Sequence, residues 1–463
     1  MNAFQIFPPT RWNCATYGRA AVQRLRRPNA QKLPHRPPWV VQGLYLAEDE
    51  QESEAELFNP DGSATRKQRL KAFKALMGAG VITLVTIWAA ATWLFGSLYK
   101  AEYRVDNLTV LVANYDNGIF GQALLSSIQT VGSGPTIPTF IHTNMTVEEV
   151  KEKVWAGDVW GALWANAGQS EAFNTSLADA ATAETYNPAN AYIYTGIQSR
   201  YFTVFQSYLY PVFLETTGIA SGIVTTAAAG LTLDRQNLSP AQLKVLGHPA
   251  SSTFYNPAPF TFTVRVLVNT VGIVIPMLLQ FFFLMGLNGI FTGFGIHRST
   301  SAATLLKIKY PVKIVWTLIT GLSSASFAYI FAEGWDMPAK NFIALWALSW
   351  VYCLISFSTF AFLIAVVPIA FLSSFVFPIV MTSVAATVFP IEVQNAFYRI
   401  SYMFPSHAYW NAAITIYANG AYHKLHIYLP ILAAWLVVGE LAQCFAEYTT
   451  AKKSWKKQEE AEH

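Results

Sequence analysis

Four long stretches of this chain contain no Asp, Glu, Lys or Arg. They cover residues 75–99, 266–297, 314–332 and 341–391. A membrane-spanning helix needs about 20 apolar residues, each adding about 1.5 Å of length. Each of the first three stretches therefore accommodates one span, whereas the fourth accommodates two spans with a turn near Pro368.

A sixth apolar segment runs from residue 427 to residue 446 and contains a single acid, Glu440. The pattern thus predicts an α-helical multi-pass membrane protein with six transmembrane helices and a large domain between helices one and two. We expect these helices at residues 75–99, 266–290, 312–332, 342–365, 368–389 and 427–446.

Residues 100–262, between the first two predicted spans, alternate between strand-like and helix-like patterns. Thr146 and Glu149 form a capping box at the start of an apolar helical stripe, and residues 198–229 form a long helical pattern. Short apolar, β-branched runs predict strands at residues 108–113, 139–142, 159–164 and 192–194. Strands that alternate with helices predict an α/β domain of about four strands.

The distribution of charge indicates which ends of the spans face the cytoplasm. Only 13% of the residues are charged, about half the usual share of about 25% in a soluble protein. Basic residues gather before the first span, between the second and third, and after the sixth. These clusters are Arg66, Lys67, Arg69, Lys71 and Lys74; Arg298, Lys307, Lys309 and Lys313; and Lys452, Lys453, Lys456 and Lys457.

If the spans alternate in direction, all three clusters lie on one side of the membrane, which is the positive-inside pattern. Both termini, with the tails 1–65 and 447–463, are therefore expected in the cytoplasm. Nucleic acid is not an expected partner, because these residues flank spans and do not form a basic folded face with stacking aromatic rings.

Glycosylation sequons predict the same topology. All four occur between the first and second spans, at Asn107, Asn144, Asn174 and Asn237, so the α/β domain is predicted to be extracytoplasmic. The arginine-rich, acid-free beginning of the tail also fits a mitochondrial presequence. The clustered sequons favour the secretory route, so we expect a disordered cytoplasmic tail and a plasma-membrane protein, with another secretory-pathway membrane as the alternative.

The sequence contains few signs of catalysis or of cofactor binding. It has no Walker-type phosphate loop, no H-E-x-x-H motif and no G-x-S-x-G motif, and its three cysteines lack zinc-binding spacing. Asp116, after the first strand, could serve catalysis, but Asp is also common in turns, where it binds the local backbone. We expect no enzymatic activity, no metal and no cofactor.

Glu440 is the candidate transport residue within the spans. A carboxylate inside the membrane is costly unless it is paired, protonated or in contact with water. A proton or substrate site would explain it. The alternative is an acid near the inner end of the helix that reaches toward Lys452 or Lys453.

Residues 390–425 lie between the fifth and sixth predicted spans and are too polar to cross the membrane. Their prolines and aromatic residues suit an external, interfacial or re-entrant segment. We expect this segment to act as a gate or as a lipid-facing collar, and Tyr398, Arg399 and His407 are its candidate residues.

Particular motifs link the chain to a known family. An Asp-Gly turn follows the first strand, and F-P-x-E, F-Y-R and P-S-H motifs occupy residues 389–392, 397–399 and 405–407. Together with the order of spans, they resemble the fungal nitrosoguanidine-resistance membrane protein family over about residues 70–446. That family is similar to the permease part of type-two ABC transporters and to bacterial phage-infection-protein-like proteins. The resemblance implies toxin resistance or export at a fungal cell membrane, and it implies no catalytic residue.

We therefore expect a permease-like protein that exports or redistributes hydrophobic small molecules or lipids, including secondary metabolites. Its energy would come from a separate ATPase subunit, a proton gradient or a concentration difference, and it could act as a homodimer. The alternative is a non-transporting membrane scaffold or regulator whose outer domain binds a partner.

Overall fold

The chain divides into two units, residues 1–78 and 79–463. A computed structural model describes residues 66–231, 237–259, 264–296, 300–332 and 337–462. The predicted tail 1–65 lies outside the described residues. The described part of the first unit is the beginning of helix α3 (Arg66–Leu98), and the contacts below all lie within the second unit.

Five of the described helices are long and apolar enough to cross a membrane, which indicates a multi-pass membrane protein. They are Arg69–Leu98 of α3, Phe202–Ala229, α11 (Val271–Gly293), α14 (Ala339–Val366) and Leu425–Lys452 of α17 (Leu425–Glu462). Four of them overlap the predicted spans 75–99, 266–290, 342–365 and 427–446, whereas Phe202–Ala229 belongs to the segment between the first and second spans.

Helices also occupy the two remaining predicted spans, but they are not among these five. Helix α15 (Leu372–Val388) is apolar but has only 17 residues. Helix α13 (Ala302–Ile330) is long but carries lysines in its first half. The turn predicted near Pro368 is confirmed, because α14 ends at Val366 and Pro368 precedes the short helix η6 (Ile369–Phe371).

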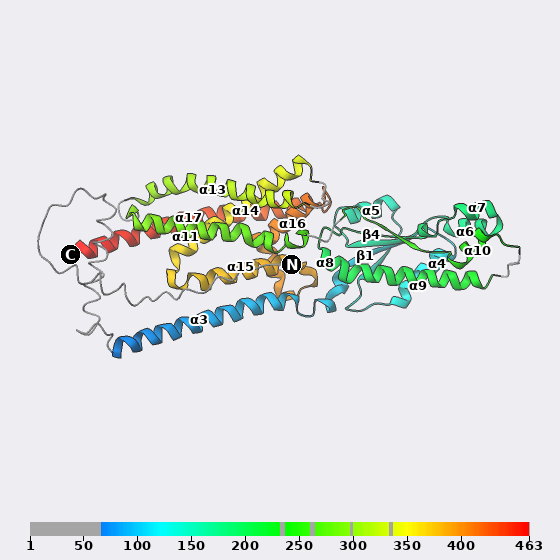
Figure 1. The fold of residues 1–463 in the computed structure, drawn as a ribbon, viewed down its shortest axis with the longest axis horizontal. Coiled ribbons are helices and arrows are strands. Elements are labelled where there is room, and N and C mark those ends of the chain that lie inside the picture. Colours follow the sequence, from blue (N-terminus) through cyan, green and yellow to red (C-terminus); the bar gives the residue numbers. More distant parts are fainter. Residues whose placement is uncertain (1–65, 232–236, 260–263, 297–299, 333–336, 463) are drawn as a thin grey trace, which may run out of the picture. The chain divides into compact units, whose positions relative to one another are not determined.

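The segment between α3 and α11 contains a five-stranded sheet in the order β2-β1-β3-β4-β5 (Figure 1). Only the β3–β4 pair is antiparallel among the described strands. The strands are β1 (Thr109–Asn114), β2 (Thr139–Thr143), β3 (Gly161–Ala165), β4 (Tyr192–Gly196) and β5 (Ser252–Tyr255). The first four confirm the predicted strands. The sequence analysis missed β5, an edge strand of four residues.

Alternate residues of β1 face the two sides of this sheet, as the pleat requires. Val110 and Val112 belong to the core shared with α4 (Ile119–Val131) and α9 (Tyr210–Ala229), whereas Leu111 and Ala113 belong to the core shared with α5 (Val147–Trp155). The predicted capping box of α5 is confirmed, since Glu149 N donates to Thr146 Oγ1 at 3.3 Å and Thr146 N to Glu149 Oε2 at 2.8 Å.

The apolar composition of Phe202–Ala229 is explained by its burial against the sheet. Phe213 stacks on Tyr194 of β4 with 5.4 Å between ring centroids, and Phe205 stacks on Phe254 of β5 at 5.5 Å. Figure 1 shows α9 lying along one face of the sheet. This helix therefore buries its apolar side chains within the segment between α3 and α11, which we call the sheet domain.

Helix α16 (Pro405–Tyr417) lies between α15 and α17 in the chain, and most of its residues are buried. The remaining short helices are η2 (Ala101–Asn107), α6 (Gln169–Ala178), α7 (Ala180–Thr185), η3 (Pro188–Asn190), α8 (Phe202–Val204), η4 (Phe205–Leu209), α10 (Pro240–Gly247), η5 (Val264–Leu267), η7 (Ile391–Val393) and η8 (Ala396–Met403).

A turn between α16 and α17 connects the helices to the sheet domain. Tyr422 N donates to Trp155 O at 2.7 Å, at the end of α5. Tyr422 adopts φ 67°, which a non-glycine residue rarely does. Gly157, at φ 75°, permits this contact, because a Cβ there would lie 2.3 Å from the Tyr422 ring. Lys424 then pairs with Asp158. We call this contact the junction.

Candidate functional site

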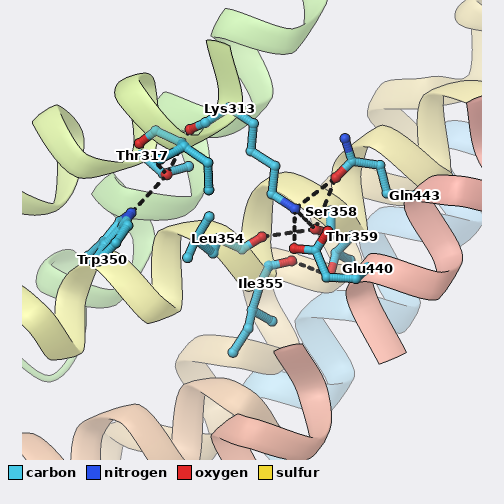
Figure 2. A network of polar contacts seen from close by, with 10 residues as sticks. Lys313, Thr317, Trp350, Leu354, Ile355, Ser358, Thr359, Glu440 and Gln443 are labelled. Carbon is cyan, nitrogen blue, oxygen red and sulfur yellow. Dashed lines mark hydrogen bonds and ion pairs between the residues drawn. The ribbon is translucent and has the colours of Figure 1, made fainter. Parts of the chain in front are cut away.

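A lysine buried between three helices is the centre of the candidate site (Figure 2). Lys313 lies on α13, and none of its side chain is exposed. Its ammonium group donates hydrogen bonds to Glu440 Oε1 and Gln443 Oε1 on α17, at 2.5 and 2.8 Å, and to Ser358 Oγ on α14, at 2.8 Å. An ammonium group has three N–H donors, so each donor has an acceptor.

Two glycines allow the three helices to approach closely at this site. A Cβ on Gly321 of α13 would lie 2.9 Å from the backbone of Trp350 on α14. A Cβ on Gly439 of α17 would lie 3.1 Å from the Cβ of Ser358 on α14. The absence of side chains at both positions brings α13 and α17 against the same helix, so that Lys313 reaches the acceptors on α17.

A second ion pair joins the same two helices. Lys309 Nζ contacts both carboxylate oxygens of Glu447, at 2.9 and 2.8 Å, and both side chains are buried. Lys309 precedes Lys313 by one helical turn, whereas Glu447 follows Glu440 by two turns. The pairing is therefore that of antiparallel helices, in which later residues of one helix meet earlier residues of the other.

The two members of the central pair differ in their access to the surroundings. The Lys313 side chain is fully buried, whereas 32% of the Glu440 side chain is exposed. A buried charge without a partner is unstable inside a protein or a membrane. Lys313 therefore depends on Glu440 for its counter-charge, whereas part of the Glu440 side chain is open to the surroundings.

An apolar cleft lies between α11, α13 and α16. Its volume is about 260 Å³, and Val271, Ile275, Phe327, Ala328 and Trp410 are among the residues that line it. Ligand sites for apolar molecules are concave and lined mainly by aliphatic and aromatic side chains. The cleft has the chemistry for an acyl chain or an apolar ring.

The three candidate residues of segment 390–425 differ in their surroundings, and their role as a gate or collar remains a prediction. Tyr398 donates to Trp93 O on α3 at 2.9 Å, and Arg399 is exposed. His407 is buried on α16, where its Nδ1 lies 3.0 Å from Ala386 O. Because a carbonyl oxygen only accepts, Nδ1 carries the proton. Tyr398 thus contacts α3, and His407 contacts α15.

Comparison with known proteins places the chain in a family. A family model described as a protein of unknown function (DUF3533) matches residues 79–441. The chain belongs to the DUF3533 family. Neither a curated protein nor a solved structure matched the sequence. The part shared with DUF3533 contains the sheet domain, Lys313 and Glu440, whereas Glu447 lies beyond the match.

In this DUF3533 protein, Glu440 does not have the partner expected for an acid at the membrane interface, which was Lys452 or Lys453. Glu440 pairs with Lys313, while Lys452 is exposed and the side chain of Lys453 lies outside the described residues. The ion pair between Glu440 and Lys452 is therefore wrong as a prediction. The sequence analysis missed the true partner because it placed Lys313 among the basic residues that flank the spans. The sequence does contain a signal for this pairing, namely the spacing of the charged residues. The two lysines are one turn apart on one apolar helix, the two acids are two turns apart on another, and each pair therefore occupies one side of its helix.

Other candidate residues of the DUF3533 domain can be located on the sheet domain. The four sequon residues Asn107, Asn144, Asn174 and Asn237 are exposed, as a glycan requires, and their glycosylation remains a prediction. Asp116 is buried, and its carboxylate accepts from Gly118 N, Gly121 N and Ser170 N, which supports the turn interpretation. The described residues contain no group of three His, Cys, Asp or Glu placed to hold a metal ion.

Proposed function

We propose that this protein is a permease-like membrane protein that exports or redistributes hydrophobic small molecules or lipids, and that it thereby confers resistance to toxic compounds. The apolar cleft between α11, α13 and α16 carries the proposal, because its lining suits an acyl chain or an apolar ring better than a polar solute. The resemblance to nitrosoguanidine-resistance proteins and to type-two ABC permeases supports the same function.

The proposal includes six spans, formed by α3, α11, α13, α14, α15 and α17. The lysines Lys309 and Lys313 are the main obstacle to placing α13 in the membrane, and both have acidic partners on α17. Helix α15 becomes long enough when η6 is added to it. Phe202–Ala229 is assigned to the extracytoplasmic domain, because it covers the sheet.

This topology leaves both termini in the cytoplasm, as the basic clusters require. The sheet domain and its sequons then face the exterior or the lumen. The proposed location is the plasma membrane, with another membrane of the secretory pathway as the alternative.

We propose that a proton gradient acts at the Lys313–Glu440 pair. Protonation of Glu440 would remove the counter-charge of a fully buried lysine and weaken the link between α13 and α17. Phe327 and Ala328 of α13 line the cleft, so movement of α13 would change the space available to a ligand. A separate ATPase subunit, or transport down a concentration gradient, is the competing energy source.

One observation favours a second candidate function, that of a scaffold or regulator whose outer domain binds a partner. A cavity of about 690 Å³ lies where β1 and β3 end, and its lining includes polar side chains such as Asn166 and Gln169. In parallel sheets, ligands bind beyond the carboxyl ends of the strands, where neighbouring connections diverge. This cavity would take a polar ligand and needs no transport.

The test is transport of a fluorescent lipid by the purified protein in liposomes, with and without a proton gradient. Ala328→Trp should block transport, because an indole ring fills the cleft, whereas Ile319→Trp on the exposed side of the same helix should not. Glu440→Gln should abolish the response to the gradient, because glutamine does not titrate. Equal lipid movement in protein-free liposomes would overturn the permease and leave the scaffold.

A further inference from the structure

A buried arginine at the junction holds its guanidinium group in a fixed position. Arg200 lies in the turn after β4, and only 6% of its surface is exposed. The guanidinium carbon lies 3.6 Å from the ring centroid of Trp160 and 4.8 Å from that of Tyr422. A guanidinium plane is held well by aromatic faces. The orientation of this group is therefore set before any ligand arrives.

Only one of the three guanidinium nitrogens of Arg200 has a hydrogen-bond partner among the described residues. Nη2 donates to Glu392 Oε1 at 3.2 Å, whereas Nε and Nη1 donate to no described atom. The neighbouring Ser199 Oγ is also buried without a partner in the described chain. Buried donors are normally satisfied, so this set of donors points to a group that binds there.

The geometry of these free donors selects the chemistry of the ligand. A guanidinium group presents its N–H donors as a planar fork that matches the two oxygens of a carboxylate or phosphate. The carboxylate of Glu392 takes only one prong of this fork, and a third of its side chain is exposed. Nε and Nη1 are themselves buried, so an anionic ligand reaches them when the partly exposed Glu392 side chain turns toward solvent.

A short series of aromatic rings connects this arginine with the apolar cleft. The ring of Trp160 lies 6.3 Å from that of Tyr201, and the ring of Tyr201 lies 6.1 Å from that of Trp410. Trp410 is one of the residues that line the cleft. Successive ring contacts therefore link the donors of Arg200 to the lining of the cleft.

We propose that Arg200 binds the anionic group of an amphiphile, a carboxylate or a phosphate, whose apolar part occupies the cleft between α11, α13 and α16. This inference rests on the proposed function, because it names the class of hydrophobic ligand that the cleft accepts. A neutral hydrophobic molecule would use the cleft alone and would gain nothing from Arg200.

The test compares a pyrene-labelled fatty acid with its methyl ester, each binding to the purified full-length protein in detergent micelles. The acid should bind at least about tenfold more tightly than the ester, as a charge-assisted hydrogen-bond pair provides. Arg200→Gln should reduce the affinity for the acid to that for the ester and leave the ester unchanged. Lys244→Gln, which removes an exposed charge from α10 of the same domain, should change neither affinity.

Each other outcome decides against the inference. Equal binding of acid and ester by the wild type would leave the proposed function standing and overturn the role of Arg200, whereas binding of neither would overturn both. A parallel loss of acid and ester binding in Arg200→Gln would make Arg200 a structural residue. Displacement of the acid by inorganic phosphate alone would assign the site to a soluble anion.

A second variant keeps the test decisive if Arg200→Gln does not fold. Glu392→Gln retains the arginine and removes the competing carboxylate, so the acid should bind more tightly while the ester is unaffected. Unchanged or weaker binding of the acid by Glu392→Gln would overturn the inference.

Discussion

The central ion pair should respond unequally to the loss of each partner. Loss of Glu440 leaves the ammonium group of Lys313 fully buried without a counter-charge. Loss of Lys313 leaves the carboxylate of Glu440 on a side chain that is already 32% exposed, and water or lipid headgroups can solvate it. Removal of one partner from a buried pair is costly because the remaining charge is stranded.

Glu440→Gln should therefore lower the free energy of unfolding by about 3 kcal/mol, and Lys313→Met should lower it less. Unfolding of the purified protein in detergent measures both. The double variant Lys313→Met with Glu440→Leu should be more stable than Glu440→Gln, because no charge remains buried. Lys340→Met, which removes an exposed lysine from α14, is the control, and equal losses in the two single variants would contradict the asymmetry.

Single residues also show what can be learned from the sequence about the site. Glu440 was identified because one acid in a long apolar segment is conspicuous. Its partner lies 127 positions away in the chain, and Arg200 lies 192 positions from Glu392. Local patterns identify a residue that is out of place, but tertiary packing alone determines which residue it meets.

At the scale of elements, close contact of α13 and α17 with α14 depends on glycine. Gly321→Ala should lower the free energy of unfolding by about 1–3 kcal/mol, because the new methyl group meets the backbone of Trp350. In Gly286→Ala on α11 the methyl group meets no atom within 4 Å. That variant should be neutral or gain up to about 1 kcal/mol from helix propensity. Denaturant unfolding distinguishes them, and equal effects would contradict the close contact.

The elements themselves were predictable where the local pattern matched the final environment. Strands β1 to β4 were recognised because they are short, apolar and β-branched. Two helices mislead when composition alone is considered. Phe202–Ala229 has the apolar composition of a span, but its apolar side chains pack against the sheet. Helix α13 has lysines that make its composition too polar for a span, but these lysines are paired with acids on α17.

At the scale of the whole molecule, the junction should make stability depend on pH. Hydrogen bonds from Lys424 and then Lys153 hold the pKa of the Asp158 carboxyl below its usual range. A lowered folded-state pKa means that the stabilisation is complete above the unfolded value of about 3.9 and is lost as pH falls through the folded-state pKa.

Asp158→Asn should therefore lower the melting temperature at pH 7, and the difference from wild type should shrink below about pH 4. Thermal unfolding at several pH values measures this difference. Glu184→Gln removes an exposed acid from α7 and should show no such dependence. A difference that stays constant down to pH 3 would exclude the charge of Asp158 as its cause.

The proposed topology is tested through the exposed sequons of the sheet domain. Glycosidase should increase the mobility of the wild-type protein, and Asn→Gln at positions 107, 144 and 174 together should remove most of that shift. Asn117→Gln, at an exposed asparagine outside any sequon, is the control. Digestion of the sheet domain only after cells are opened would place it in the cytoplasm or an internal compartment and contradict a surface location.

The pairing of α13 with α17 has a consequence for biogenesis. Ribosomes add about 5–20 residues per second, so Glu440 is synthesised roughly 6–25 seconds after Lys313, which precedes it by 127 positions. Until then the lysines of α13 lack their acids, and each costs about 2.5–3.5 kcal/mol at the centre of a bilayer. In the proposed six-span topology, helix α13 therefore has to wait beside the insertion machinery until the last helix emerges, and a chain truncated before α17 would expose a half-inserted helix to quality control.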